Sequence, residues 1–208
     1  MVIFKLKLLS HLQTDIFMQN SGLSCVNLQT LRVHQDFVSP NTQLDYYIKN
    51  NASPDILKYV DLQGKTFGEK YMEPIAHDWF KLEKRTSSAH DHSKNGKTIE
   101  QKSARYHASG DDWKWQHIEM KHDWDVLMLT GLDFDCIRFY VASRNVVVQL
   151  ISDGIITGQG KKNEEGIAEA QQAYWFSRND FKRKNKAFAD YFVEINTEAD
   201  LCKYLDTI

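Results

Sequence analysis

Three residues that together could hold a metal ion and activate a water flank one Asn-Gly dipeptide: Asp91 before it, Glu100 and Lys102 after it. Asn-Gly between two short runs of strand-forming residues is the strongest local signal for a hairpin with a two-residue type I′ turn. With Asn95 and Gly96 as the loop, counting outward pairs Asp91 directly with Glu100. Directly paired residues share a face of the sheet, with Cβ atoms ~5 Å apart. The sequence therefore predicts two facing carboxylates.

Two facing carboxylates repel each other unless a cation lies between them, and hard divalent cations prefer carboxylate oxygens. Lys102 is expected on the same face as Glu100, because strand side chains alternate. Its ammonium group could orient or activate a water and stabilise a phosphorane-like transition state. Ile99 points to the opposite face, where a core is expected. If the turn is longer than two residues, Asp91 lies diagonal to Glu100, still within reach of a bridging metal.

Helices are expected before this hairpin. Residues 42–61 predict one or two short helices, with Ser53-Pro54-Asp55 as a helix start. Residues 64–82 predict an amphipathic helix that Pro74 kinks or breaks. Its apolar residues recur at intervals of three and four: Phe67, Tyr71, Ile75, Trp79 and Leu82.

The remaining pattern is mostly strand-like. Strands are expected at 86–92, 97–105, 124–130, 135–142 and 188–195, helices at 145–151 and 197–205, and a long loop at 157–166. Ser143 is the expected cap of the first of these helices. A Gly-Leu-Asp turn, residues 131–133, is expected to join the two buried strands. The order predicts an α/β or α+β domain with a mixed central sheet.

Composition limits the classes of protein. The chain has 208 residues, of which 42% are hydrophobic and 12% aromatic, which suits one folded domain. No apolar run approaches the ~18 residues of a membrane span. The N-terminal stretch has no features of a signal peptide, and the three cysteines are expected to be free thiols, so we expect a cytoplasmic protein. The net charge of −2 does not by itself indicate a nucleic-acid partner.

Residues 87–106, SSAHDHSKNGKTIEQKSARY, resemble the active-site hairpin of the PD-(D/E)xK nuclease superfamily. Asp91 matches the first acid, and Glu100-Gln101-Lys102 matches the (D/E)xK element. Ala89-His90 precedes the acid where the motif's name has proline. Within the superfamily the chain looks most like a type II restriction endonuclease. The resemblance covers residues 64–142.

The resemblance implies a restriction-endonuclease-like α/β core, with a mixed central sheet flanked by helices. It implies Mg²⁺ as cofactor, Asp91, Glu100 and Lys102 as catalytic residues, and Asp91 and Glu100 as metal ligands. A glutamate of the preceding helix often joins the metal site, and Glu69 is preferred to Glu73; both could equally be surface acids. A metal-activated water would attack the phosphodiester without a covalent intermediate, and the 3′ oxygen would leave.

We expect a single nuclease domain over 1–208, made of an N-terminal helical extension (1–62), a catalytic core (63–155) and a DNA-recognition loop with a C-terminal strand and helix (156–208). A basic cluster spans 178–186. The candidate DNA-binding residues are Gln116, His117, Gln171, Gln172, Arg178, Asn179 and Lys182. Trp113 and Trp115 beside them are expected in the core.

The sequence thus predicts a Mg²⁺-dependent, sequence-specific type II restriction endonuclease that cuts double-stranded DNA. A homodimer is expected, because a two-fold dimer matches a palindromic site. Two alternatives stay open: a structure-specific repair or junction-resolving nuclease, and a non-catalytic DNA-binding module. A histidine-metal nuclease built on His90 and His92 is disfavoured, because no matching Asn and second His follow on a short helix. The acids Asp123, Asp125, Asp133 and Asp135 are expected at turns and strand edges.

Overall fold

The computed structural model describes residues 42–107, 110–159 and 173–208. Four helical segments come first: α3 (Thr42–Lys49), α4 (Pro54–Val60), the π-helix η2 (Thr66–Met72) and α5 (Glu73–Phe80). The two short helices and the start at Ser53-Pro54 are as predicted. The helix expected at 64–82 is interrupted near Pro74, as predicted: the π-helix η2 ends at Met72 and the α-helix α5 begins at Glu73, one residue before the proline.

The apolar stripe predicted for 64–82 is wrong in its details. Tyr71 is 40% exposed and Trp79 is 56% exposed, whereas the buried side chains are Phe67, Met72, Ala76 and Phe80. A π-helix has a wider turn than an α-helix, so the interval from Phe67 to Met72 is five residues. The strict α-helical spacing therefore identified Phe67 and Leu82 as buried correctly, but it placed Tyr71 and Trp79 on the wrong face.

One nine-stranded sheet organises the chain, in the order β7-β8-β4-β3-β5-β6-β9, with β1 and β2 on a branch beside β3. The strands are β1 (Glu83–Lys84), β2 (His92–Lys94), β3 (Lys97–His107), β4 (Asp112–Glu119), β5 (Val126–Leu132), β6 (Ile137–Ser143), β7 (Thr157–Gly158), β8 (Ala173–Ser177) and β9 (Val193–Ile195). Among the strands of the described ranges, only β3 and β5 pair in parallel. The structure is therefore α/β with a mixed, mostly antiparallel sheet.

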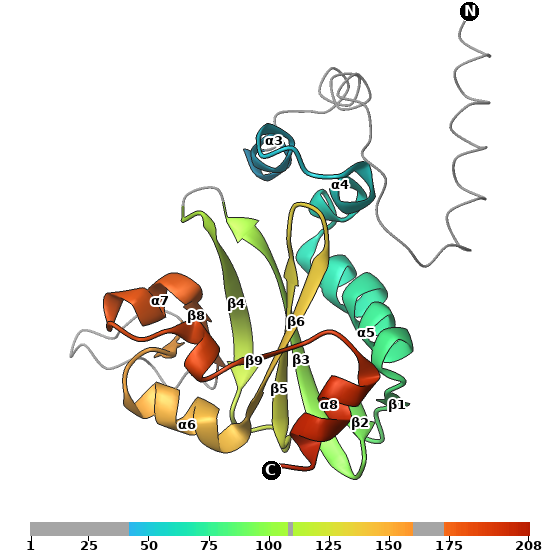
Figure 1. Cartoon of the computed structure of the whole chain (residues 1–208), viewed down its shortest axis with the longest axis vertical. Helices are drawn as coiled ribbons and strands as arrows, with labels where there is room; N and C mark the ends of the chain where they lie inside the picture. The colour runs from blue at the N-terminus through green and yellow to red at the C-terminus, as the bar shows by residue number, and fades with distance from the viewer. Residues whose placement is uncertain (1–41, 108–109, 160–172) are drawn as a thin grey trace, which may run out of the picture.

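The long strand β3 carries Glu100 and Lys102 and pairs with three other strands. Its first residues pair with β2, its last residues pair with β4, and its other edge pairs with β5 from Ile99 to Arg105. Figure 1 shows β3 running through the middle of the molecule, with α5 on one side and β4 on the other. Residues of β3 therefore sit between the preceding helices and the later strands.

Two apolar clusters pack on the two faces of the sheet. Alternation along β5 divides them: Leu127 and Leu129 join a large cluster with Trp113 and Trp115, whereas Val126 and Met128 join a smaller one. The smaller cluster includes residues of α5 and of the C-terminal helix α8 (Glu198–Leu205). Both tryptophans are fully buried, as predicted.

Helix capping follows the sequence closely. The Ser143 hydroxyl accepts from Val146 N–H at the start of α6 (Arg144–Ser152), and Thr197 begins α8 with a capping box. A short helix, α7 (Arg178–Arg183), follows β8. The strand expected at 188–195 is shorter: η3, a 3₁₀ turn over Phe188–Asp190, precedes β9. The strand expected at 86–92 is also mostly loop, where Ser87 Oγ accepts from Ala89 N–H in a local turn.

The turn between β5 and β6 lies later than predicted. Both Gly131 and Leu132 belong to β5, and the loop closes where Asp133 N–H donates to the Cys136 carbonyl. Gly131 is required for close packing instead, because a Cβ there would lie 2.7 Å from the indole of Trp113. The path of β5 at Gly131 thus depends on the absence of a side chain and not on a turn.

We expect Gly131→Ala to lower the free energy of unfolding by about 1–3 kcal/mol, because Trp113 is held in a full core and cannot move aside without strain. Gly110→Ala is the control, since a Cβ at Gly110 meets nothing within 4 Å. Urea unfolding followed by tryptophan fluorescence measures both. Equal stability of the two variants would contradict the close-packing explanation.

Two further observations concern the chain as a whole. Of its helices in the described ranges, none combines the length and the apolar character needed to cross a lipid bilayer. Cys136 and Cys202 are half-buried free thiols, as expected, and Cys25 lies outside the described residues.

Candidate active site on the central hairpin

The β2–β3 hairpin has the predicted register. Lys94 pairs with Lys97 around Asn95 and Gly96, both of which have positive φ, as a type I′ turn requires. Asp91 N–H donates to the Ile99 carbonyl at 3.0 Å, although Ile99 already pairs with His92, so the regular register ends at that pair. The direct pairing of Asp91 with Glu100 that the two-residue loop predicted is therefore not formed.

Glu100 and Lys102 form an ion pair on one face of β3. The Lys102 Nζ lies 2.7 Å from a Glu100 oxygen, and the Glu100 side chain is only 5% exposed. Burial raises the pKa of Glu100, while the Lys102 ammonium lowers it and the Asp91 carboxylate raises it again. The three residues therefore influence one another electrostatically, and the predicted grouping is present.

The Asp91 carboxylate is fixed by the backbone of the opposite strand. Its Oδ2 accepts from Gln101 N–H at 2.8 Å. Gln101 is itself 4% exposed and sits on the other face of β3. The residue between the glutamate and the lysine of the motif thus holds the first acid in place through its main chain.

The side chain of Gln101 makes a buried network. Its Nε2 donates to the Met72 carbonyl at 3.0 Å and to Thr130 Oγ1 at 2.8 Å, and its Oε1 lies 2.8 Å from His92 Nε2. Because a carbonyl can only accept, the amide nitrogen must face Met72. His92 Nε2 then donates to the amide oxygen, which fixes the imidazole tautomer. Gln101 ties β3 to η2, β5 and β2 at once.

The two histidines beside Asp91 are both buried. Burial lowers the pKa of His92, which keeps its ring neutral, and the hydrogen bond with Gln101 opposes that effect. His90 is 6% exposed; its Nδ1 lies 3.3 Å from Ser87 Oγ, and its Nε2 has no partner. Both imidazole rings therefore lie mostly inside the protein, and His92 also lines the cleft beside the hairpin.

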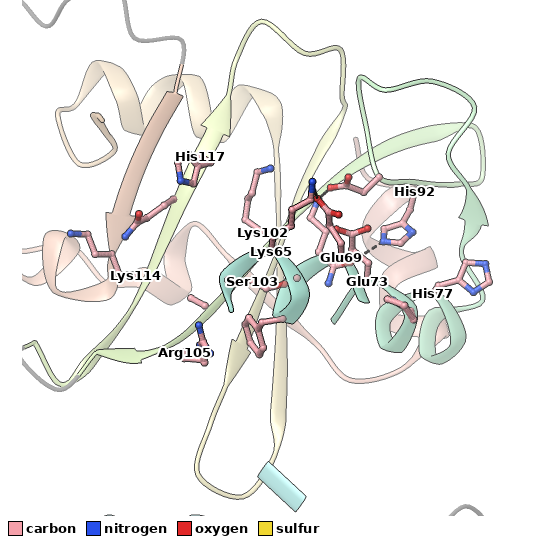
Figure 2. A pocket seen from close by; sticks show the side chains of 18 of the residues that line it. Lys65, Glu69, Glu73, His77, His92, Lys102, Ser103, Arg105, Lys114 and His117 are labelled. Carbon is pink, nitrogen blue, oxygen red and sulfur yellow. Dashed lines mark hydrogen bonds and ion pairs between the residues drawn. The ribbon is translucent and has the colours of Figure 1, made fainter. Parts of the chain in front are cut away.

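A cleft of about 1270 Å³ opens beside the hairpin. Asp91, His92, Gln101 and Lys102 line it, and Figure 2 shows Lys102 near its middle, between Glu73 on one side and Lys114 on the other. The helical wall comes from η2 and α5, and the opposite wall from β4. Glu100 lies behind Lys102, with 4% of its surface exposed.

The two helix glutamates line this cleft but differ in their surroundings. The Glu69 side chain is 57% exposed and lies 3.8 Å from Lys65. Glu73 is half-buried, and burial, followed by the Asp91 carboxylate, raises its pKa to about 7. Glu69, which was the preferred metal ligand, is therefore an acid in a surface ion pair with Lys65. Glu73 is the glutamate whose pKa the Asp91 carboxylate raises.

A raised pKa means that Glu73 binds its proton more tightly in the folded than in the unfolded chain. This stabilisation is complete below the unfolded pKa and is lost as the pH rises through about 7. In metal-free buffer at pH 8, we expect Glu73→Gln to be more stable than the native chain, on the order of 1 kcal/mol after allowance for solvent screening. At pH 4.5 the two should unfold alike.

Thermal unfolding between pH 4.5 and 8.5 in EDTA measures the difference. Glu69→Gln is the matched control, because the same charge is removed from an exposed position. If the melting temperatures of Glu73→Gln and of the native chain differ by the same amount at every pH, the raised pKa of Glu73 would be contradicted.

The donor groups at the hairpin fit Mg²⁺. This ion is usually held by one or two carboxylates and keeps several waters, and the Asp91 carboxylate lies close enough to Glu100 and to Glu73 to raise the pKa of each. The three expected metal ligands, Asp91, Glu100 and Glu69, do not bring their ligand atoms within 4.8 Å of one another. Within the described ranges, the group of three or more such side chains whose ligand atoms lie within 4.8 Å is Asp133, Asp135 and Cys136, at the β5–β6 turn.

The residues predicted to bind DNA are scattered. Gln116 and His117 line the cleft from β4. Gln171 and Gln172 lie outside the described residues. Lys182 is exposed on α7.

Arg178 and Asn179 make contacts inside the protein. Arg178 Nε donates to Asp112 at 2.7 Å and Nη2 to the Tyr106 hydroxyl, and its guanidinium stacks 4.2 Å from the Trp113 ring. Asn179 Nδ2 donates to the Gly110 carbonyl. These contacts anchor α7 to β4 and occupy the groups that would read base edges.

The sequence did not predict the roles of three residues that line the cleft. Gln101 holds neighbouring segments together by hydrogen bonds, and Arg105 and Lys114 are cations of the cleft wall. Alternation places Gln101 on the core face with Ile99, and a glutamine there signals a buried polar network. Nothing local signals Arg105 or Lys114, because their neighbours in the cleft come from distant segments.

Comparisons of the chain with family models, with curated proteins and with solved structures found no match. The function must therefore be inferred from the residues and their geometry.

Proposed function

We propose that this protein is a Mg²⁺-dependent nuclease that hydrolyses phosphodiester bonds in double-stranded DNA. One observation carries the proposal: at the edge of a large cleft the Asp91 carboxylate accepts from Gln101 N–H and raises the pKa of the neighbouring Glu100, and the Lys102 ammonium lies 2.7 Å from Glu100. Two neighbouring acids with an adjacent lysine are suited to metal-assisted attack of water on phosphate.

Asp91 and Glu100 would hold the metal, with Glu73 as the nearest additional carboxylate. When bound, Mg²⁺ would supply a water of lowered pKa and charge stabilisation for the phosphoryl oxygens. Lys102 is placed to donate hydrogen bonds to that water or to a phosphate oxygen. Gln101 fixes Asp91 from its backbone N–H, so the acid need not reorganise during the reaction.

Double-stranded DNA is the proposed substrate because of the cations around the cleft, among them Lys65, Arg105 and Lys114. Polyanion binding depends on such groups. Sequence-specific cutting of the restriction type, with a homodimer acting on a palindrome, rests on the resemblance of residues 87–106 to the nuclease superfamily. The cytoplasm is the compartment proposed for it.

The test is incubation of the purified chain with long duplex DNA, with Mg²⁺ in one arm and EDTA in the other. Discrete fragments in Mg²⁺ and intact DNA in EDTA support the restriction reading. Cutting of branched but not linear duplex would replace it with the junction-resolving alternative. Intact DNA in every arm, across Mg²⁺ and Mn²⁺ and several genomic substrates, would overturn the nuclease proposal.

A further inference from the structure

We propose that the end of the cleft away from Asp91 is a binding arm for the phosphates of a DNA strand, formed by Arg105 and Lys114. This inference rests on the proposed function, since it assigns the path of the substrate beyond the cutting site. It differs from the sequence-based placement of DNA recognition at 157–186.

Arg105 has the geometry of a preorganised anion site. Its Nη1 donates to the carbonyls of Val60 and Leu62, both at 2.6 Å, and its guanidinium lies 4.7 Å from the ring centroid of Phe67. These contacts fix the plane of the group from behind. A guanidinium has five N–H donors in a rigid fork, so most of its donors remain after Nη1 is used.

The remaining donors of Arg105 are open to the cleft. Within the described ranges, the buried side-chain polar atoms that lack a hydrogen-bond partner are Ser53 Oγ and His90 Nε2. Because Nε and Nη2 of Arg105 are not among these atoms, we infer that they are accessible to solvent. Arg105 itself lines the cleft. A fixed fork with free donors matches the bidentate geometry of a phosphate.

Among the ion pairs of the residues that the structure describes, none includes Arg105. Its hydrogen-bond partners are backbone carbonyls. Burial lowers its pKa, and Tyr47 and Asp61 act in the opposite direction, but a guanidinium remains charged at any physiological pH. A half-buried cation of this kind is stabilised by an incoming anion.

Lys114 supplies a second cation on the neighbouring strand. Its Nζ lies 3.9 Å from the ring centroid of Trp175 on β8, which holds the ammonium over the ring at the cleft wall. Among the ion pairs of the described residues, none includes Lys114. Figure 2 shows Lys114 and Arg105 on the side of the cleft opposite Glu73 and His92.

The acids that line the cleft, Glu69, Glu73, Asp78 and Asp91, come from the helical wall and the hairpin, whereas the described residues of β4 contribute no acid to its lining. Arg105 lies five residues along β3 from Glu100, which is about 17 Å at the rise of an extended strand. Duplex DNA advances 3.4 Å per nucleotide of one strand, so a phosphate at Arg105 belongs to a nucleotide up to about five steps from the cutting site.

The experiment measures binding without cutting. A fluorescein-labelled 30-base-pair duplex is titrated in EDTA, by anisotropy, at several salt concentrations. Lys114→Ala removes one cation, and Arg105→Lys keeps the charge but removes the fork. Lys203→Ala is the matched control, because Lys203 is exposed on α8 and does not line the cleft. Melting temperatures identify any variant that folds poorly, and Lys114→Ala leaves the carbonyl contacts of Arg105 intact.

We expect Lys114→Ala to weaken binding about tenfold at low salt, equally for unrelated sequences, and to reduce the slope of log affinity against log salt by about one. Arg105→Lys should weaken binding with little change in slope. If Lys114→Ala and Arg105→Lys both bind DNA with the same affinity as Lys203→Ala, the proposed binding arm is contradicted, even where the native chain cuts DNA. If the binding losses appear but no DNA is ever cut, the arm stands and the nuclease proposal fails.

Discussion

Asp91→Asn is expected to cut duplex DNA at least about a hundredfold to a thousandfold more slowly than the native chain in Mg²⁺. Asparagine has the same size and keeps an oxygen that can accept from Gln101 N–H, so the hairpin should persist. What is lost is the negative charge that raises the pKa of Glu100. The rate loss would therefore report a missing metal ligand and not a disrupted fold.

Lys102→Ala should cause a loss of similar size for a different reason. Removal of the ammonium 2.7 Å from Glu100 leaves a buried carboxylate without its ion pair, so its pKa should rise further. The optimum of cutting should then move to higher pH, whereas Asp91→Asn should lower the rate at every pH.

Initial rates on a defined duplex between pH 6 and 9 measure both effects, with circular dichroism as the check on folding. Asp190→Asn is the control, because Asp190 is an exposed acid in η3, outside the cleft. Native-like rates from either site variant would remove Asp91 or Lys102 from the proposed chemistry.

Gln101→Met is expected to lower the free energy of unfolding by about 2–4 kcal/mol. Methionine has a similar volume but offers none of the hydrogen bonds that now satisfy the Met72 carbonyl, Thr130 Oγ1 and His92 Nε2. Each of those buried groups would lose a partner. Asp91 would keep its backbone contact and β3 would stay paired with β2 and β5, but the Gln101 side-chain links to η2, β5 and β2 would be lost.

A purely structural role would change stability alone, so a second readout is needed. If Gln101 positions the site, Gln101→Met should also require more Mg²⁺ for half-maximal cutting, at a temperature where the variant is fully folded. Gln149→Met is the matched control, since the Gln149 amide makes an exposed hydrogen bond to Asp153 on α6. An unchanged Mg²⁺ requirement for folded Gln101→Met would limit that residue to stabilising the fold.

The ¹⁵N shifts of His92 give a test that does not depend on activity. In the native chain, Nε2 should carry the proton and Nδ1 should not, because Gln101 Oε1 accepts from Nε2. The fixed tautomer should be lost in Gln101→Met. A native His92 with its proton on Nδ1 would contradict the network.

The sequence by itself determined the local features of this protein. Asn95-Gly96 determined the hairpin register, because positive φ at two successive residues is compatible with few other pairs. That register, with alternation along a strand, was enough to place Lys102 beside Glu100 with Asp91 nearby, but not to pair Asp91 directly with Glu100, because the paired residues end at His92 and Ile99. Ser143 and Thr197 determined helix starts for the same kind of reason, since each cap contacts only the next few residues.

Only the tertiary structure decided what surrounds the hairpin. The π-helix η2 shifted the buried face of residues 64–82, so Glu73 is half-buried and its pKa is raised by burial and by Asp91, while Glu69 has an exposed side chain. Gly131 proved to be a packing residue, because Trp113 approaches it from another strand. Arg178 belongs to an internal contact with Asp112, and Arg105 and Lys114 form a positive end of the cleft. These features depend on contacts between residues far apart in sequence, which local spacing does not encode.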